Sequence, residues 1–167
     1  MAPEASDAAD RDQPPAPYTA AGQILASLYL KWLLVFEDHE AQVLWLGKAV
    51  PRDWLVAGEA PLSAQRLSTR YGRIGLRLEV LSGGAAGAAM GANVTLPGGF
   101  CPPAGGIRLR IRTPPVLVGR LSTVTVGGRV WTAVDAAAET VHFSARDLAD
   151  GKVREAMQRI VATYSVS

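Results

Sequence analysis

The chain has 167 residues, of which 49% are hydrophobic and 19% charged, a size that suits one compact domain with a sizeable core rather than two. Seventeen Lys and Arg against fifteen Asp and Glu leave a net charge of +2, too small to favour a nucleic-acid partner. Cys101 is the single cysteine, which excludes an internal disulfide and a cysteine-based zinc site.

Residues 1–18 are rich in Ala, Asp and Pro and hold almost no large apolar side chain, so we expect a disordered leader. Acidic residues stand where an export signal would carry basic and then apolar ones. The sequence therefore indicates no signal peptide and leaves the compartment open. We expect residues 19–167 to form one domain.

An apolar helix is predicted over 23–36, a stretch without Gly or Pro. Lys31 interrupts it, and it is shorter than the roughly 20 residues that cross a bilayer, so we expect no membrane span. Its apolar residues extend round most of the cylinder. Such a helix is expected to have neighbours on more than one side.

After this helix the hydrophobic period changes to two, which is typical of strands. We expect a single helical turn over 51–55, a long flexible loop over the glycine-rich 82–92, a locally helical segment over 153–159 and an edge strand over 160–166. The strands predicted before that last one cover 42–46, 62–69, 73–81, 94–96, 107–111, 122–126, 129–134 and 140–143.

Short strands joined by turns, without crossover helices, predict an all-β fold. We expect an antiparallel, two-sheet, jelly-roll-like β-sandwich preceded by the apolar helix. Gly127-Gly128 is typical of a tight hairpin turn, since both glycines accept positive φ.

The sequence offers no candidate catalytic residue, metal ligand set or cofactor site. Gly47-Lys48 lacks both the earlier glycine and the following Ser or Thr of a phosphate-binding loop. The acidic run 37–40 is interpreted as a solvated turn, because four consecutive residues cannot converge on one ion. No Gly-x-Ser-x-Gly elbow is present, and no base stands near Cys101 in the sequence.

Five arginines are expected on the outward faces of two strands, where they would form one basic stripe if the strands were neighbours. That stripe would bind an acidic glycan or a partner domain, or would be a solvated face that discourages edge pairing. Trp131 would stack on a sugar or pack against cross-strand neighbours. The arginines are Arg73, Arg77, Arg108, Arg110 and Arg112, and the candidate ligand-binding residues are Trp131, Tyr71, Arg77, Arg108 and Arg110.

Three motifs carry a resemblance to a known family. They are Val-Pro-Arg-Asp-Trp-Leu at 50–55, Thr-Arg-Tyr-Gly at 69–72 and Val-Thr-Val-Gly-Gly-Arg-Val-Trp at 124–131. Together they resemble the carboxy-terminal β-sandwich of glycoside-hydrolase-like proteins whose catalytic domain is a six-hairpin (α/α)6 barrel, including relatives of α-L-rhamnosidases. The likeness spans about 23–145, and Gly127 stands where the family has Asn.

The resemblance implies a non-catalytic accessory domain that buttresses an (α/α)6-barrel catalytic domain, in cis or in trans, with the catalytic carboxylates in the barrel. The alternative is a stand-alone carbohydrate-binding module that uses Trp131, Tyr71 and the arginines. We expect the segment 44–55 to be a structural corner in which Trp54 and Leu55 cap the core. Local hydrogen bonds of Arg52 or Asp53 would fix its turn.

Overall fold

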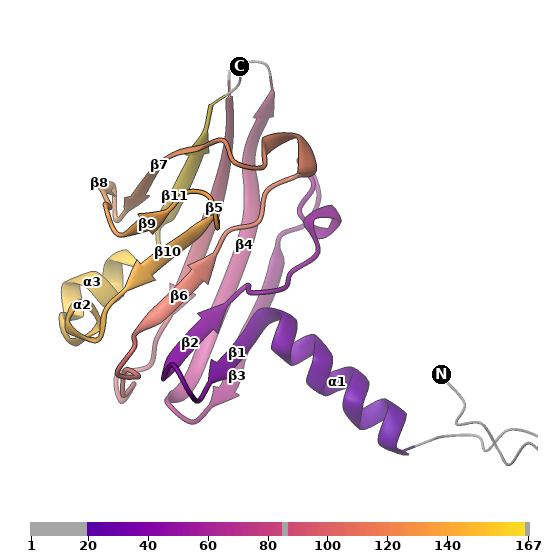
Figure 1. Ribbon diagram of the computed structural model, residues 1–167, viewed down its shortest axis with the longest axis vertical. Helices are drawn as coiled ribbons and strands as arrows, with labels where there is room; N and C mark the ends of the chain where they lie inside the picture. Colours follow the sequence, from indigo (N-terminus) through magenta and orange to yellow (C-terminus); the bar gives the residue numbers. More distant parts are fainter. Residues whose placement is uncertain (1–19, 85–86, 166–167) are drawn as a thin grey trace, which may run out of the picture.

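The computed structural model describes residues 20–84 and 87–165, and these form two facing sheets with one helix projecting from them (Figure 1). The five-stranded sheet has the order β1-β2-β6-β10-β9, and the six-stranded sheet the order β3-β4-β5-β11-β7-β8. The strands are β1 (Val35–Asp38), β2 (Val43–Leu46), β3 (Leu62–Thr69), β4 (Gly72–Gly84), β5 (Gly87–Thr95), β6 (Ile107–Arg110), β7 (Leu121–Val126), β8 (Arg129–Val130), β9 (Val134–Asp135), β10 (Thr140–Phe143) and β11 (Ile160–Tyr164).

The predicted all-β, two-sheet sandwich is confirmed. Its strand pairs are antiparallel, except that β2 runs parallel to β6. The predicted N-terminal helix is α1 (Ala20–Leu34), after which the chain passes directly into β1, so the last two residues of the expected 23–36 helix are extended. The leader expected over 1–18 lies outside the described residues.

The core lies between the two sheets and follows from period-two patterning. Ile74, Leu76 and Leu78 of β4 face it from one sheet, and each is at most 3% exposed. Ile107, Leu109 and Ile111, on and just after β6, face it from the other sheet. Full burial of such a side chain contributes about 1.5–3 kcal/mol, so this alternation is sufficient to fix which face of each strand points inward.

The glycine-rich segment 82–92, predicted to be a flexible loop, is instead a long hairpin formed by β4 and β5, which remain paired as far as Gly84 and Gly87. Ala88, Met90 and Ala92 alternate toward the core. A Cβ added at Gly91 would lie 3.1 Å from Leu81 Cδ2 and 3.2 Å from Glu79 Cγ. The small residues of β5 are therefore explained by its close packing against the side chains of β4.

Two further expectations near the carboxyl end need correction. The segment 160–166 was expected to form an edge strand, but β11 lies between β5 and β7 in the middle of its sheet. The helix expected over 153–159 begins earlier, as α3 (Gly151–Ala156). Before it lies α2 (Ala145–Ala149), whose start is fixed by a capping box between Ser144 and Asp147.

The predicted hairpin at Gly127-Gly128 is present. The turn between β7 and β8 has φ of +59° at Gly127 and +82° at Gly128, as a tight two-residue connection requires. The pairing of β3 with β4 shifts between Ala64 and Leu67, where the chain forms a β-bulge. Among the described residues, no helix is long and apolar enough to cross a membrane.

Candidate functional site

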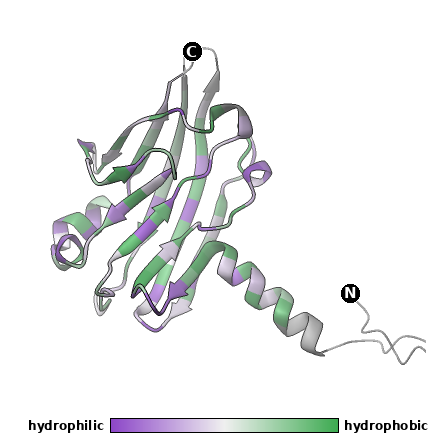
Figure 2. Cartoon of the chain, viewed as in Figure 1, coloured by the Kyte–Doolittle hydropathy of each residue, from purple (hydrophilic) through white to green (hydrophobic). Residues whose placement is uncertain are grey.

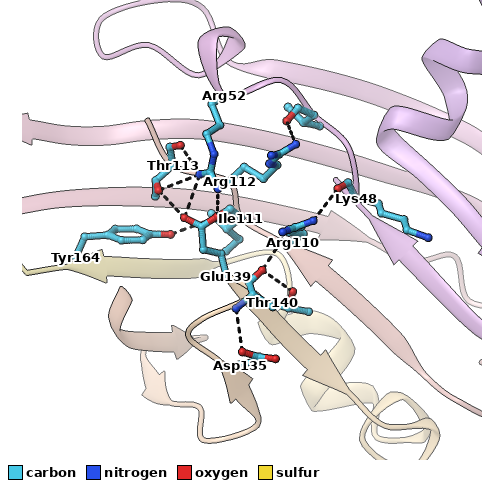
Figure 3. Close-up of polar contacts among 12 residues, drawn as sticks. Lys48, Arg52, Arg110, Ile111, Arg112, Thr113, Asp135, Glu139, Thr140 and Tyr164 are labelled. Atoms are coloured by element: carbon cyan, nitrogen blue, oxygen red, sulfur yellow. Dashed lines mark hydrogen bonds and ion pairs between the residues drawn. The ribbon is translucent and has the colours of Figure 1, made fainter. Parts of the chain in front are cut away.

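Arg52 lies at the centre of a buried polar cluster between the corner 44–55 and the five-stranded sheet (Figure 3). Its guanidinium donates to both carboxylate oxygens of Glu139, over 2.7 Å from Nη2 to Oε2 and 3.1 Å from Nη1 to Oε1. Nη1 also donates to the carbonyl oxygen of Thr113 at 2.6 Å, and the Thr113 hydroxyl donates to Glu139 Oε1 at 2.6 Å. The Glu139 carboxylate thus accepts two parallel hydrogen bonds from the planar guanidinium of Arg52 and a third from the Thr113 hydroxyl.

Three separate parts of the chain position this cluster. Pro51 precedes the short 3-10 helix η1 (Arg52–Trp54) that carries the arginine. Thr113 follows β6, and Glu139 occupies the turn before β10 with a positive φ of +53°. The hydrogen bonds of Arg52 thus join residues 61 and 87 positions apart, so the expectation of local bonds is wrong.

The corner 44–55 was expected to cap the core through Trp54 and Leu55, and only one of the two does so. Leu55 is buried, whereas Trp54 is 44% exposed. Gly47, considered above as part of a Gly-Lys motif, has φ of +64°, and a Cβ there would lie 2.7 Å from the carbonyl oxygen of Arg110. Its backbone N–H donates to the carbonyl of Leu34 at 2.7 Å. The glycine thus permits the close approach to the β6 backbone, and its N–H bond joins the end of α1 to the corner.

Burial by itself raises the pKa of the Glu139 carboxyl, but the hydrogen bonds from Arg52 and Thr113 and the charge of Arg52 outweigh it. The net effect holds the pKa below its ordinary value. Burial, with the nearby charges of Arg52 and Arg110, lowers the pKa of Arg112 despite Glu139, and burial chiefly raises that of Tyr164. The Glu139 carboxylate is therefore charged, fully hydrogen-bonded and closed to a substrate, so the cluster is a structural anchor.

The five strand arginines do not form the single stripe considered above. Arg73 and Arg77 belong to β4 in the six-stranded sheet, whereas Arg108 and Arg110 belong to β6 in the other sheet. Arg110 donates to the carbonyl oxygens of Ala138 and Lys48 (Figure 3). Arg112 lies beyond the end of β6, and its Nε is buried. Sequence periodicity placed the other four side chains outward correctly, but it contains no information on which strands are neighbours.

Arg108 lies beside the Trp45 ring on the outer face of the five-stranded sheet, and Lys48 lies over a second ring, that of Phe36. Its guanidinium carbon is 5.2 Å from the centroid of the Trp45 ring, and Lys48 Nζ is 4.0 Å from the centroid of Phe36. These cation–π contacts cover the rings with the protein's own cations. The arrangement leaves Arg108 engaged within the chain.

The two candidate aromatic residues also make structural contacts. Trp131 Nε1 donates to the carbonyl of His142 at 2.9 Å, and its ring centroid lies 5.1 Å from that of Phe143. Tyr71 packs against the edge of the core, and its carbonyl accepts from the N–H of Cys101. These contacts favour the interpretation that Trp131 packs against cross-strand neighbours over the interpretation that its ring stacks on a sugar.

The acidic run 37–40 is part of a charged network, and its first two residues belong to β1. Glu37 pairs with Arg70 over 3.2 Å and with Lys31 over 3.8 Å. Arg70 Nη2 also lies 3.4 Å from His39 Nε2. No group of three or more His, Cys, Asp or Glu within the described ranges is arranged to hold a metal ion.

Helix α1 is held by the sandwich at its last turn and extends away from it, with hydrophobic residues along its length (Figures 1 and 2). The carbonyls of Leu33 and Leu34 accept from the N–H groups of Ala49 and Gly47. Exposed apolar side chains further along the helix are Leu25, Tyr29, Leu30 and Trp32. A hollow of about 540 Å³ adjoins Trp32, bordered by the end of α1, β1 and the β3–β4 turn.

Comparison of the chain with family models, with curated proteins and with solved structures found no match.

Proposed function

We propose that this chain is a non-catalytic accessory β-sandwich of a carbohydrate-active protein, which docks through α1 onto an (α/α)6-barrel catalytic domain and buttresses it. The barrel is either on the same polypeptide or on a separate one. The observation that carries the proposal is the exposed apolar surface of α1. The role of the sandwich in this proposal is structural support.

The exposed surface of α1 is unusual for a helix that begins a domain. Tyr29 and Leu30 are each more than half exposed, and Leu25 and Trp32 are 44% and 41% exposed. A helix of 15 residues is marginal in water without tertiary contacts, and here the sandwich holds it at one end. Apolar groups that gather on a surface in this way are typical of an interface.

A helical partner suits this surface better than a sheet or a sugar. Side chains on α1 form ridges that fit between those of neighbouring helices, and the outer layer of an (α/α)6 barrel is made of helices. Lys31, Glu37 and Arg70 lie beside the apolar residues and supply a polar rim, as most interfaces have. The motifs at 50–55, 69–72 and 124–131 support the same partner.

The first test is to read the coding sequence next to that of this chain, where the proposal expects a domain of paired helical hairpins with two acidic residues placed for glycoside hydrolysis. The second is to produce that barrel with the 167-residue chain and to measure complex formation by size-exclusion chromatography with light scattering.

The changes Leu30→Glu and Tyr29→Glu, which place charge on the exposed face of α1, should weaken the complex by at least about tenfold. Val130→Glu is the matched control, because Val130 is an exposed apolar residue on β8. It should leave the complex intact. Absence of such a barrel from all proteins of the same organism, or a complex that resists both α1 changes, would overturn the proposal.

A further inference from the structure

A second hollow, of about 480 Å³, lies on the outer face of the six-stranded sheet over β3, β4 and β5. Its middle is Gly75, which pairs with Thr95 of β5. Arg73 and Arg77 flank Gly75 on the same side of β4, because alternate residues of a strand share a face. A glycine between two arginines leaves the floor of the hollow free of side chain.

The bulge in β3 brings a third arginine to the same place. Pairing with β4 skips from Ala64 to Leu67, so two residues of β3, Gln65 and Arg66, lie opposite the single residue Gly75. Arg66 has φ of +58°, a conformation that costs a non-glycine residue about 1 kcal/mol or more. Bulges of this kind redirect a side chain and are frequent beside binding sites.

The charge of the hollow is unbalanced. Arg66, Arg73 and Arg77 line it, and none of the described residues that line it is acidic. Arg77 pairs with Glu79 at 2.8 Å, whereas the side chains of Arg66 and Arg73 have no hydrogen bond or ion pair within the described part of the chain. Anionic groups bound in the hollow would stabilise these guanidinium groups through charge-assisted hydrogen bonds.

Neutral hydrogen-bonding groups complete the lining. Ser63 and Asn93 lie on either side of Arg77, and Thr95 lies across from Gly75. These hydroxyl and amide groups match the hydroxyls of a sugar. The size is within the usual range of ligand sites, about 300–1,000 Å³. Arg73 and Arg77 are four positions apart, or about 14 Å along a strand, so more than one carboxylate can be contacted.

From this geometry we propose that the hollow is a binding site for an oligosaccharide that carries carboxylate groups, a short chain of uronic acid units. Arg66 and Arg73 bind carboxylates through their planar, two-pronged donor sets, and Ser63, Asn93 and Thr95 bind sugar hydroxyls. Gly75 leaves room for the ring. The site shares no residue with the α1 surface, so the inference does not depend on docking to a barrel.

The test is calorimetric titration of the full chain with a galacturonate trisaccharide and with the same trisaccharide in its uncharged methyl-ester form. The acid should bind saturably, and the ester at least about tenfold more weakly, which corresponds to the loss of charge-assisted contacts. Hexaglutamate and inorganic sulfate are parallel arms. Both should bind more weakly than the sugar acid.

Two variants locate the site, and a third is the control. Arg66→Ala should weaken binding about tenfold, and Gly75→Val should do so without a change in charge, by filling the floor. A Cβ at Gly75 would lie 3.3 Å from Thr95 Cβ, so folding is checked by thermal melting. If Gly75→Val does not fold, Arg66→Lys takes its place, since it keeps the charge and loses the planar fork. Arg129→Ala removes an exposed arginine from the β7–β8 hairpin and should bind as the unaltered chain does.

The inference is overturned if the trisaccharide does not bind, if its ester binds equally, or if Arg129→Ala weakens binding as much as Arg66→Ala. Tighter binding of hexaglutamate would indicate a peptide site, and equal binding of sulfate a simple anion site, and either result also overturns it. The α1 variants should retain sugar binding. Failure of the barrel complex and failure of this site are thus separate results.

Discussion

At the scale of single residues, the buried pair of Arg52 and Glu139 explains why the corner 44–55 holds its place. The Glu139 side chain is 1% exposed and the Arg52 side chain 18% exposed. Removing one member of such a pair is expected to lower the free energy of unfolding by about 3–5 kcal/mol, because the other charge stays buried without its partner. The arginine thus positions the corner instead of binding a ligand.

The same pair predicts an acid-dependent loss of stability. The pKa of Glu139 is lower in the folded chain than its ordinary value of 4.5. Its carboxylate therefore contributes stability that is fully present above pH 4.5 and is lost as the pH falls through the lower, folded pKa. Urea unfolding at a series of pH values from neutral to below 4.5 should show this decline in the unaltered chain.

Glu139→Gln should be less stable at neutral pH and should lack this part of the decline. Glu40→Gln is its control, since Glu40 is an exposed residue in the turn before β2, and this change should leave the acid profile nearly as it was. Profiles of Glu139→Gln and the unaltered chain that run parallel down to the lowest pH would contradict the assignment.

At the scale of elements, period-two patterning was sufficient to predict most of β4, β6, β7 and β10, because each alternates apolar with polar residues. The extent of β3 was also predicted, although its bulge interrupts the alternation. It failed for β5, where Ala88 and Ala92 face the core but glycine and alanine also occupy the other face. The alternation of Ala88, Met90, Ala92 and Val94 was the available signal. The small size of the alanine and glycine side chains concealed this alternation, since composition alone cannot distinguish a flexible glycine-rich loop from a closely packed strand.

The β5 assignment predicts a clear difference between adjacent positions. Met90→Ala should lower the free energy of unfolding by about 2–5 kcal/mol, because Met90 is fully buried and its removal leaves a cavity. Ala89→Ser, one residue away on the other face, should change it by less than about 0.5 kcal/mol. Denaturant unfolding measures both. Equal, small effects at the two positions would restore the flexible-loop interpretation.

At the scale of the whole molecule, the two-sheet architecture was predictable, whereas the candidate sites were predictable only in part. Arg77 was correctly placed on an outward face, but Arg66 was not considered, because the bulge that redirects it depends on pairing with β4. The division of the arginines between two sheets depends on strand order. The exposure of α1 was foreseeable from the sequence, because its apolar residues extend round most of the helix and one sandwich can cover only one side of it.

That exposure predicts the behaviour of the chain in solution. Without a partner domain, the apolar side chains of α1 are expected to bury themselves against another copy, so the isolated chain should self-associate as its concentration rises. Sedimentation velocity over a concentration series should show this, and Leu25→Glu with Leu30→Glu should shift the chain toward monomer. Val118→Glu, an exposed apolar position after β6, is the control and should not. A chain that stays monomeric at high concentration would mean that α1 is stable in water as it stands, and the docking surface proposed for it would lose its physical basis.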